Sequence, residues 1–506
     1  SAVFNAGMTG FVGRNGVGKT TLLKLISGAL SPTSGSVDVA GRIAVLDQAV
    51  SAGEGETLAK LFGIEVMLAA IESAERGEAD AEALAVIDWT AEERAAAALA
   101  RLDLAVPLST PLARLSGGEI TRARLAALAF EAPDFILLDE PTNNLDAAGR
   151  EALIRFLSDF RGGALVVSHD RTLLEHMDAI VELTTLGMTR YGGNFSFYEA
   201  EKEAERLALE HELRDARKDV RKTARIVRER SERKARRDAM GRRLRARRDQ
   251  PKMVLDGMKA QAEGTGARDR ALSERQQQEA ASELASARAK VEVVAPFTVT
   301  LAHSGLASGR RVAAADRLAG GYHPEQPLFR DLSFEMTGPE RVAITGRNGA
   351  GKSTLIAILT GQLAPLGGSA EIHVTYALFD QTVSLLEPDR TVRDNFRRLN
   401  SDDDENACRA ALARFRFRAD AALQSVSTLS GGERLRAGLA AAIGGTRPME
   451  LLILDEPSNH LDLESLATLE AGLNAYDGAI LVVSHDATFL ERIGVARRID
   501  LGGRAS

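Results

Sequence analysis

The chain has 506 residues, 44% of them hydrophobic, which is enough for about two to four domains with substantial cores. Its single cysteine, Cys408, excludes a disulfide framework, a cysteine-bound zinc or other metal site and an iron–sulfur cluster, and we expect it to be buried in a helix. The net charge of −7 is unevenly spread: residues 214–248 hold 17 Lys or Arg against 5 Asp or Glu, a local +12, so the rest carries −19. This asymmetry indicates a polyanionic partner for one segment only.

No apolar run approaches the ~18–20 residues that cross a bilayer. No secretory leader is recognisable at the start of the sequence. The sequence therefore predicts a cytoplasmic protein without membrane domains.

A glycine-rich loop of the pattern G-x-x-x-x-G-K-[ST] occurs twice. Glycines let successive backbone N–H groups point at phosphate oxygens, the lysine reaches the β and γ phosphates, and the final hydroxyl ligates Mg²⁺. Each loop follows an apolar run typical of a buried strand and precedes an apolar helical stretch, whose N-terminus adds positive partial charge. The sequence thus predicts two ATP sites. Their loop residues are Gly13, Arg14, Asn15, Gly16, Val17, Gly18, Lys19, Thr20 and Thr21, then Gly346, Arg347, Asn348, Gly349, Ala350, Gly351, Lys352, Ser353 and Thr354.

The sequence before the two loops differs in length. Only 12 residues precede the first loop, whereas Tyr322 lies 24 residues before Gly346. We expect a first strand pair, together with the aromatic residue that would stack on adenine, to be missing or greatly shortened in the first copy. Tyr322 could supply the aromatic ring in the second.

A glutamine ends a predicted strand 29 residues after each loop lysine, at Gln48 and Gln381. The equal spacing indicates an internal duplication, and an amide at this place can bind Mg²⁺ and contact the γ phosphate. Residues 56–105 then read as helices rich in Ala, Glu and Leu. We expect Trp89 in this stretch to pack against the core and not to serve as a platform for a base.

The sequence Leu-Ser-Gly-Gly-Glu follows in both copies, ahead of a helix rich in Arg and Ala. Alone, such a sequence would be an ordinary helix N-cap. In register with the other repeats, it predicts a cradle of backbone N–H groups for an anion. The residues concerned are Ser116, Gly117, Gly118, Ser430, Gly431 and Gly432.

A run of apolar residues followed by Asp-Glu comes next, at 135–140 and 451–456. This pattern is typical of a buried strand that opens at the edge where ligands bind in open α/β sheets. The first acid can hold Mg²⁺, and the second can position or deprotonate the attacking water. Thirty residues after each Asp lies a histidine, which we expect to contact the γ phosphate. The predicted Mg²⁺ ligands are Thr20, Gln48, Asp139, Ser353, Gln381 and Asp455, and the predicted catalytic residues are Glu140, Glu456, His169 and His485.

Taken in order, these motifs resemble the ATP-binding cassette superfamily, with its Walker A loop, Q-loop, signature, Walker B strand, D-loop and switch histidine. The resemblance implies an α/β fold with two P-loop ABC ATPase domains that close head to tail on two ATP molecules within one monomer. It also implies that Ser430 and Gly432 complete the site of Lys19, and that Ser116 and Gly118 complete the site of Lys352. The segments 139–146 and 455–462 look like the ABC-F subfamily, which lacks membrane domains, and Glu in place of Gln at the end of the signature suits it.

From Glu199 the composition changes to Glu, Lys, Arg and Ala. Basic residues at 214, 218, 221, 225 and 228 share one helix face, and we expect Gly241 and Pro251 to interrupt a helix of about 40 residues. Residues 266–292 read as a returning helix, so a long basic helical hairpin is predicted. The predicted domains are 1–198, 199–295 and 296–506. The predicted RNA-binding residues near the tip are Arg242, Arg243, Arg245, Arg247, Arg248, Lys252 and Lys259.

A rod of like charge repels itself unless phosphates neutralise it, which favours RNA over a merely solvated linker. Few aromatic residues interrupt the charges, so phosphate contact is favoured over base stacking. In ABC-F proteins such a hairpin enters the tRNA exit site of the ribosome and approaches the P-site tRNA, and the resemblance implies the same rRNA and tRNA partners. The alternatives are the ATPase subunit of an ABC transporter and a DNA-maintenance ATPase. A ribosome-recycling cassette protein conflicts with the cysteine count.

Overall fold

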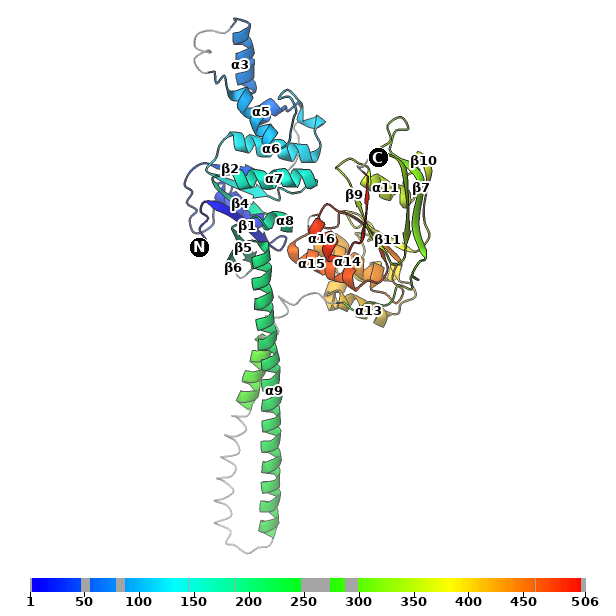
Figure 1. Ribbon diagram of the computed structural model, residues 1–506. Helices are drawn as coiled ribbons and strands as arrows, with labels where there is room; N and C mark the ends of the chain where they lie inside the picture. The colour runs from blue at the N-terminus through cyan, green and yellow to red at the C-terminus, as the bar shows by residue number, and fades with distance from the viewer. Residues whose placement is uncertain are drawn as a thin grey trace. The chain divides into compact units, whose positions relative to one another are not determined.

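The computed structural model describes residues 2–46, 55–78, 87–143, 145–185, 187–246, 274–286, 299–459 and 461–501. The chain divides into two compact units, one formed by Ser1–Tyr198 with Phe297–Ser506 and the other by Glu199–Pro296. We call the described residues up to 198 the first cassette and those from 299 the second cassette. Both cassettes are mixed α/β structures, as the sequence predicts, and a long helix lies between them in the chain (Figure 1). Because both cassettes fall in one unit, the division of the chain into three domains stays a prediction.

The first cassette is built on a six-stranded sheet of order β2-β3-β4-β1-β5-β6. All neighbours pair in parallel except β5 and β6, with Phe11 opposite Val167 on one side and Val181 on the other. The central strand β4 is buried along its whole length and β3 is buried from its second residue on, which explains their continuous apolar sequences. The strands are β1 (Gly7–Gly13), β2 (Ile43–Leu46), β3 (Phe135–Asp139), β4 (Gly163–Val167), β5 (Ala179–Thr184) and β6 (Gly187–Gly192).

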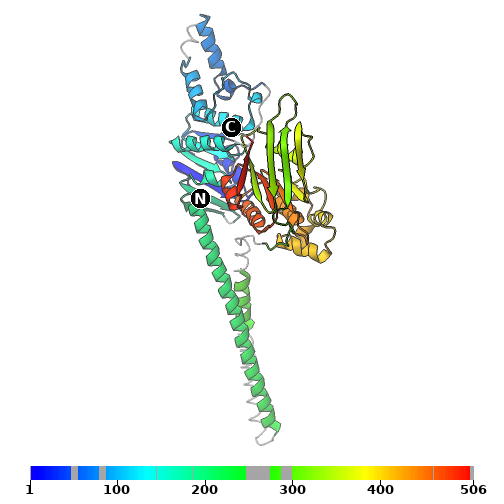
Figure 2. The ribbon, with the colours of Figure 1, turned by 45° about the vertical axis from the view of Figure 1, so that its right-hand side comes forward.

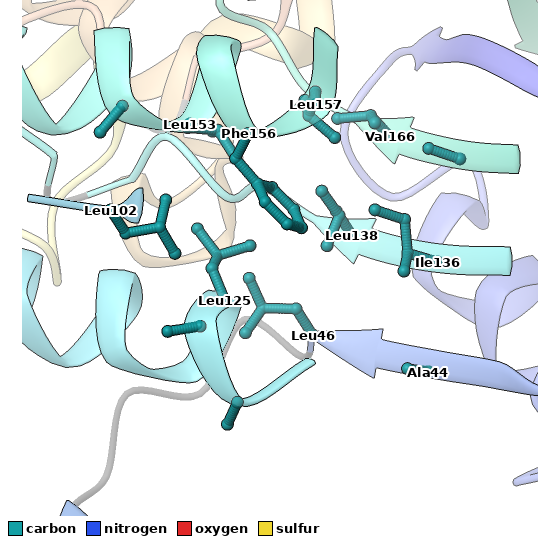
Figure 3. Close-up of a cluster of buried hydrophobic side chains, with 14 of the residues drawn as sticks. Ala44, Leu46, Leu102, Leu125, Ile136, Leu138, Leu153, Phe156, Leu157 and Val166 are labelled. Atoms are coloured by element: carbon teal, nitrogen blue, oxygen red, sulfur yellow. The ribbon is translucent and has the colours of Figure 1, made fainter. Parts of the chain in front are cut away.

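Helices cover this sheet and form the main core with it. Leu138 of β3 and Phe156 of α7 meet in the layer between sheet and helices, together with Leu46 and Leu125 (Figure 3). Trp89 is 55% exposed, so the expectation that it packs into the core was wrong. The helices are α1 (Lys19–Ile26), α2 (Leu58–Leu61), α3 (Glu65–Glu75), α5 (Ala91–Arg101), α6 (Gly117–Phe130), α7 (Ala147–Asp159) and α8 (Arg171–Leu174), with a 3-10 turn η1 (Leu112–Arg114).

The second cassette repeats this plan with a five-stranded parallel sheet of order β11-β12-β13-β9-β14. A separate three-stranded antiparallel sheet has the order β10-β7-β8. In the chain, β7 and β8 come before β9, and β10 lies between α11 and β11. Cys408 is fully buried in α13, as predicted. The strands are β7 (Arg311–Gly320), β8 (Phe329–Thr337), β9 (Arg341–Thr345), β10 (Gly367–Ile372), β11 (Tyr376–Phe379), β12 (Leu451–Asp455), β13 (Ala479–Val483) and β14 (Arg497–Asp500). The helices are α11 (Lys352–Leu359), α12 (Val392–Leu399), α13 (Glu405–Arg414), α14 (Gly431–Ile443), α15 (Leu463–Ala475) and α16 (Ala487–Arg492), with 3-10 turns η2 (Ala419–Leu423) and η3 (Val426–Thr428).

The helix α9 (Phe195–Ala246) begins earlier and runs further than predicted, over 52 residues. It continues through Gly241, which was expected to interrupt it; one helical glycine costs only about 1 kcal/mol. Ion pairs four residues apart, such as Arg225–Glu229 and Arg228–Glu232, support it on the surface. A second helix at 274–286 lies beside α9 in both views (Figures 1 and 2). It falls within the returning helix predicted at 266–292, while Pro251 lies outside the described residues.

The first turn of α9 is bound to the end of α8. The carboxylate of Glu175 accepts hydrogen bonds from the Asn194 side-chain amide at 2.8 Å, the Ser196 N–H at 2.9 Å and the Ser196 hydroxyl at 2.6 Å. Three donors on one carboxylate fix where the long helix begins. Across the parts of the chain that the structure describes, no helix combines the length and apolar character needed to span a bilayer.

Candidate nucleotide sites

Each glycine-rich loop wraps around its own lysine. The turn into the following helix passes through Gly18 at φ 109° and Gly351 at φ 96°, a region that residues with a Cβ rarely adopt. Lys19 Nζ donates to the carbonyls of Gly13 at 2.7 Å and Arg14 at 3.1 Å. Lys352 Nζ does the same in the second cassette, at 3.0 and 3.2 Å. Burial lowers the pKa of both amines, so an anionic ligand would stabilise their charged form.

A cavity of about 360 Å³ lies at the first loop, within the size range of small-molecule sites. It brings together the loop, the acidic end of β3 and the histidine at the end of β4, which are far apart in the chain. The predicted residues that line it are Asn15, Gly16, Gly18, Lys19, Thr20, Thr21, Asp139, Glu140 and His169, joined by Asn143 and Val167.

A hydroxyl and a carboxylate meet where Mg²⁺ is expected. Thr20 Oγ1 donates to Asp139 Oδ2 at 2.7 Å, and Ser353 hydrogen-bonds to Asp455 in the second site. Asp455 Oδ1 is buried without a hydrogen-bond partner, as expected for an oxygen that binds a metal ion. Among the described residues, no cluster of three or more His, Cys, Asp or Glu is suited to hold a metal ion. Gln48 lies outside the described residues, and Gln381 is exposed just after β11.

The two Glu residues after the buried strands adopt left-handed backbone conformations, with φ of 49° at Glu140 and 48° at Glu456. Non-glycine residues in this region are strained by about 1–3 kcal/mol, and such strain concentrates at functional sites. Burial raises the pKa of Glu140 to about 8 and of Glu456 to about 7. Carboxyl groups poised near neutral pH are suited to accepting a proton from water.

A neutral histidine accompanies each glutamate. His169 Nε2 lies 3.3 Å from Glu140 Oε1, and His485 Nε2 lies 3.6 Å from Glu456 Oε1. Burial lowers the pKa of His169 to about 3 and of His485 to about 4. Only the second site has a contact between its histidine and its lysine, at 2.9 Å from Nε2 of His485 to Nζ of Lys352, among the hydrogen bonds of the described residues. The sites therefore contain the same groups in different arrangements.

The Ser-Gly-Gly-Glu segments form reciprocal capping boxes at the starts of α6 and α14. The Ser116 hydroxyl donates to Glu119 Oε2 at 2.8 Å, and the Glu119 N–H donates back to Ser116 Oγ at 3.4 Å. Ser430 and Glu433 repeat this pattern. Both segments are thus helix caps in this structure. The binding of ATP by Ser116, Gly117, Gly118, Ser430, Gly431 and Gly432 stays a prediction.

Aspartates that follow the Walker B strands reach the loop of the opposite cassette. Asp462 Oδ2 accepts from the N–H of Asn15 at 2.9 Å, and Asp146 accepts from the N–H of Asn348. The two cassettes therefore meet head to tail, as the resemblance implies. Both aspartates also cap their own helices, α7 and α15. The sequence signals for them were the D-loop resemblance and the equal positions of the two residues in the repeats.

Three further polar contacts join residues of the two cassettes. Arg14 pairs with Glu464 at 2.5 and 2.9 Å on the surface. Arg171 pairs with Glu470, with both side chains buried, and its second contact measures 3.2 Å. Arg150 donates to the carbonyl of His485 at 2.8 Å. Sequence reasoning missed these contacts because nothing in the local sequence connects segments that lie 299 to 450 positions apart.

The basic surface of α9 is exposed along its described length. The exposed basic residues are Arg214, Arg217, Lys218, Arg221, Lys222, Arg225, Arg228, Arg233 and Arg236. Of the predicted RNA-binding residues, Arg242, Arg243 and Arg245 lie on α9, and nothing further is described for their side chains. Arg247, Arg248, Lys252 and Lys259 lie outside the described residues. Tyr322 is 70% exposed in the connection between β7 and β8, and its stacking on adenine stays a prediction.

Comparisons with known proteins agree with this arrangement. The family model described as ABC transporter matches residues 2–143 and 329–459. The energy-dependent translational throttle protein EttA of Mycobacterium tuberculosis is 32% identical over 96% of this chain and 84% of its own length. The ABC transporter F family member 5 of Arabidopsis thaliana is 29% identical over 96% of this chain and 69% of its own. A solved structure named RNase-L Inhibitor shares the fold, at 19% identity and a TM-score of 0.58, over 98% of this chain and 84% of that one.

Proposed function

Because this chain belongs to the ATP-binding cassette family, and within it to the ABC-F proteins, we propose that it is an ATPase that acts on ribosomes. ATP binding holds the two cassettes together, and hydrolysis releases them. The basic hairpin contacts tRNA and rRNA, and its position depends on whether the cassettes are closed.

The observation that carries the proposal is that one chain contains a long, exposed basic helix and two candidate ATP sites, each contacted by a residue of the opposite cassette. Asp462 binds the loop of the first site, and Asp146 binds the loop of the second, so neither site is complete without the opposite cassette. A ligand that binds better to the closed state shifts the population toward it. The similarity to a protein named a translational throttle supports translation as the process.

Within each site we assign separate roles to the predicted residues. Thr20 with Asp139, and Ser353 with Asp455, would hold Mg²⁺, which bridges and neutralises phosphate oxygens when bound. The loop lysines bind the β and γ phosphates. Glu140 and Glu456 orient the attacking water and accept its proton, which their raised pKa values favour. The neutral imidazoles beside them donate a hydrogen bond to the γ phosphate.

The test uses co-sedimentation of the Glu140→Gln/Glu456→Gln variant with purified ribosomes, with and without ATP. We expect pelleting that requires ATP, because this variant binds ATP without hydrolysing it and stays closed. Replacing Arg242, Arg243 and Arg245 by alanine should abolish pelleting at moderate salt. It should also lower the slope of log affinity against log salt by about two to three.

A matched control removes the same charge from the cassettes, by alanine at Arg76, Arg155 and Arg447, which are exposed. This control should pellet as before. Failure to pellet with ATP would refute the ribosome assignment. Equal losses from both triple variants would show that net charge, and not the hairpin, governs binding.

A further inference from the structure

The helices α7 and α15 occupy equivalent positions in the two cassettes, and each begins at an aspartate that binds the opposite phosphate loop. One turn further along, four residues after the aspartate, the helices differ. The first cassette has Arg150 there, and the second has Leu466. A leucine side chain has no hydrogen-bond donor, so only one of the two sites can receive a side-chain bond from this position.

The guanidinium of Arg150 connects three segments. Its Nη1 donates to the backbone carbonyl of His485 in the opposite cassette at 2.8 Å. Its Nε pairs with the carboxylate of Asp170, the N-cap of α8 in its own cassette. The side chain is only 15% exposed, so these contacts are shielded from water. Charged donors in such surroundings make the stronger class of hydrogen bond.

The residue held by this bond is central to the second site. The imidazole Nε2 of His485 lies 2.9 Å from Lys352 Nζ and 3.6 Å from Glu456 Oε1. The bond to its carbonyl restrains the short segment between the end of β13 and α16, from which the imidazole extends. Restraint of this segment fixes the imidazole relative to the lysine and the glutamate.

We propose that Arg150 is a positioning residue of the first cassette that acts on the second ATP site and has no counterpart for the first. The inference rests on the assignment of the second site under Proposed function. It makes hydrolysis at the second site depend on contact with the opposite cassette through His485. The first site is held differently, at its phosphate loop, by the pair of Arg14 with Glu464.

The test measures the two sites separately. Glu140→Gln leaves the second site active, and Glu456→Gln leaves the first. Arg150→Leu places at this position the residue that the second cassette has at 466. In the Glu140→Gln background it should lower kcat about tenfold with little change in KM. In the Glu456→Gln background it should lower kcat by no more than about twofold. Arg150→Gln repeats the measurement if the leucine variant does not fold. Equal losses in the two backgrounds, or no loss in the first, would overturn the proposal.

Two control variants separate positioning from stability. Arg155→Leu removes an exposed arginine from the same helix, one paired with Asp103 on the surface, and should leave both rates unchanged. Asp170→Asn keeps a residue that can cap α8 and removes the charge that binds Arg150 Nε. It should lower the second-site kcat by less than Arg150→Leu does, because the bond to His485 remains. A loss as large as that of Arg150→Leu would assign the effect to α8 instead.

A second readout does not depend on the two glutamates. With a non-hydrolysable ATP analogue bound, Arg150→Leu should speed amide hydrogen exchange in residues 484–488 about tenfold and leave residues 168–172 within about twofold. Unchanged exchange at 484–488 would refute the inference even if kcat falls. Full activity of both parental Glu→Gln variants would instead reject the assigned roles of the glutamates, and the exchange result would still decide on Arg150.

Discussion

The two ion pairs between the cassettes differ in burial, and this difference predicts different energetic roles. The side chains of Arg171 and Glu470 are 4% and 8% exposed, whereas those of Arg14 and Glu464 are 60% and 43% exposed. Removing one partner of a buried pair leaves an uncompensated charge and costs about 3–5 kcal/mol. An exposed pair contributes about 0–1 kcal/mol, because water solvates whichever partner remains.

Opening of the cassettes would return Arg171 to water, so we expect the cost to appear as a shift from the closed to the open state. Glu470→Ala should lower the ratio of closed to open molecules roughly 10²- to 4 × 10³-fold, at 1.4 kcal/mol per factor of ten. Glu464→Ala should change the same ratio less than about fivefold.

The assay is energy transfer between one dye on each cassette, titrated with ATP in the Glu140→Gln/Glu456→Gln background. Cys408 is replaced by serine so that dyes react only at introduced cysteines. Glu470→Ala should require far more ATP to close than Glu464→Ala does. The double variant Arg171→Met/Glu470→Leu removes both charges of the pair and leaves only Arg492, which is 35% exposed, without its contact to Glu470. It should close within about 1 kcal/mol of the parent. Equal shifts from Glu464→Ala and Glu470→Ala, or a double variant as impaired as the single one, would refute the reasoning.

Three further outcomes are expected. Burial raises the pKa of Glu140 to about 8 and of Glu456 to about 7, so each contributes stability below its unfolded pKa that is lost as pH rises through the folded pKa. The Tm of the nucleotide-free Glu→Gln double variant, minus that of the wild type, should therefore increase between about pH 5 and about pH 8. A difference in Tm that does not change with pH would contradict this. Thr20→Ala should raise the Mg²⁺ concentration for half-maximal ATPase activity about tenfold, while Ser27→Ala at the other end of α1 should not. Leu138→Ala should cost about 2–5 kcal/mol in denaturant unfolding, against about 0.5 kcal/mol or less for the exposed Val66→Ala.

Sequence reasoning predicts those parts of the structure that short stretches of sequence determine. The apolar runs before each loop become buried parallel strands, and the loop spacing places Lys19 beside Asp139 and His169 in one cavity. A parallel sheet brings the carboxyl ends of its strands to one edge, so residues 150 positions apart meet there without any long-range sequence signal. Repetition of the spacings in the second copy strengthened each of these predictions.

The remainder depended on contacts that a single sequence does not reveal. The bonds from Arg150 and Arg171 join positions 335 and 299 residues apart, and they break the symmetry of the repeat on which the reasoning relied. The continuation of α9 through Gly241 reflects a small helix penalty outweighed by neighbouring residues that favour the helix. Trp89 was misplaced because a large apolar residue does not by itself identify the surface it covers.

The short helix α8 has a geometric consequence for the chain. Arg171 at the start of α8 pairs with Glu470, and its Cζ lies 6.0 Å from the centre of the Phe195 ring. Glu175, just after the end of α8, accepts a hydrogen bond from the Ser196 N–H. The contact between the cassettes and the start of the long helix therefore share one four-residue helix. A substitution that displaces α8 would disturb both at once.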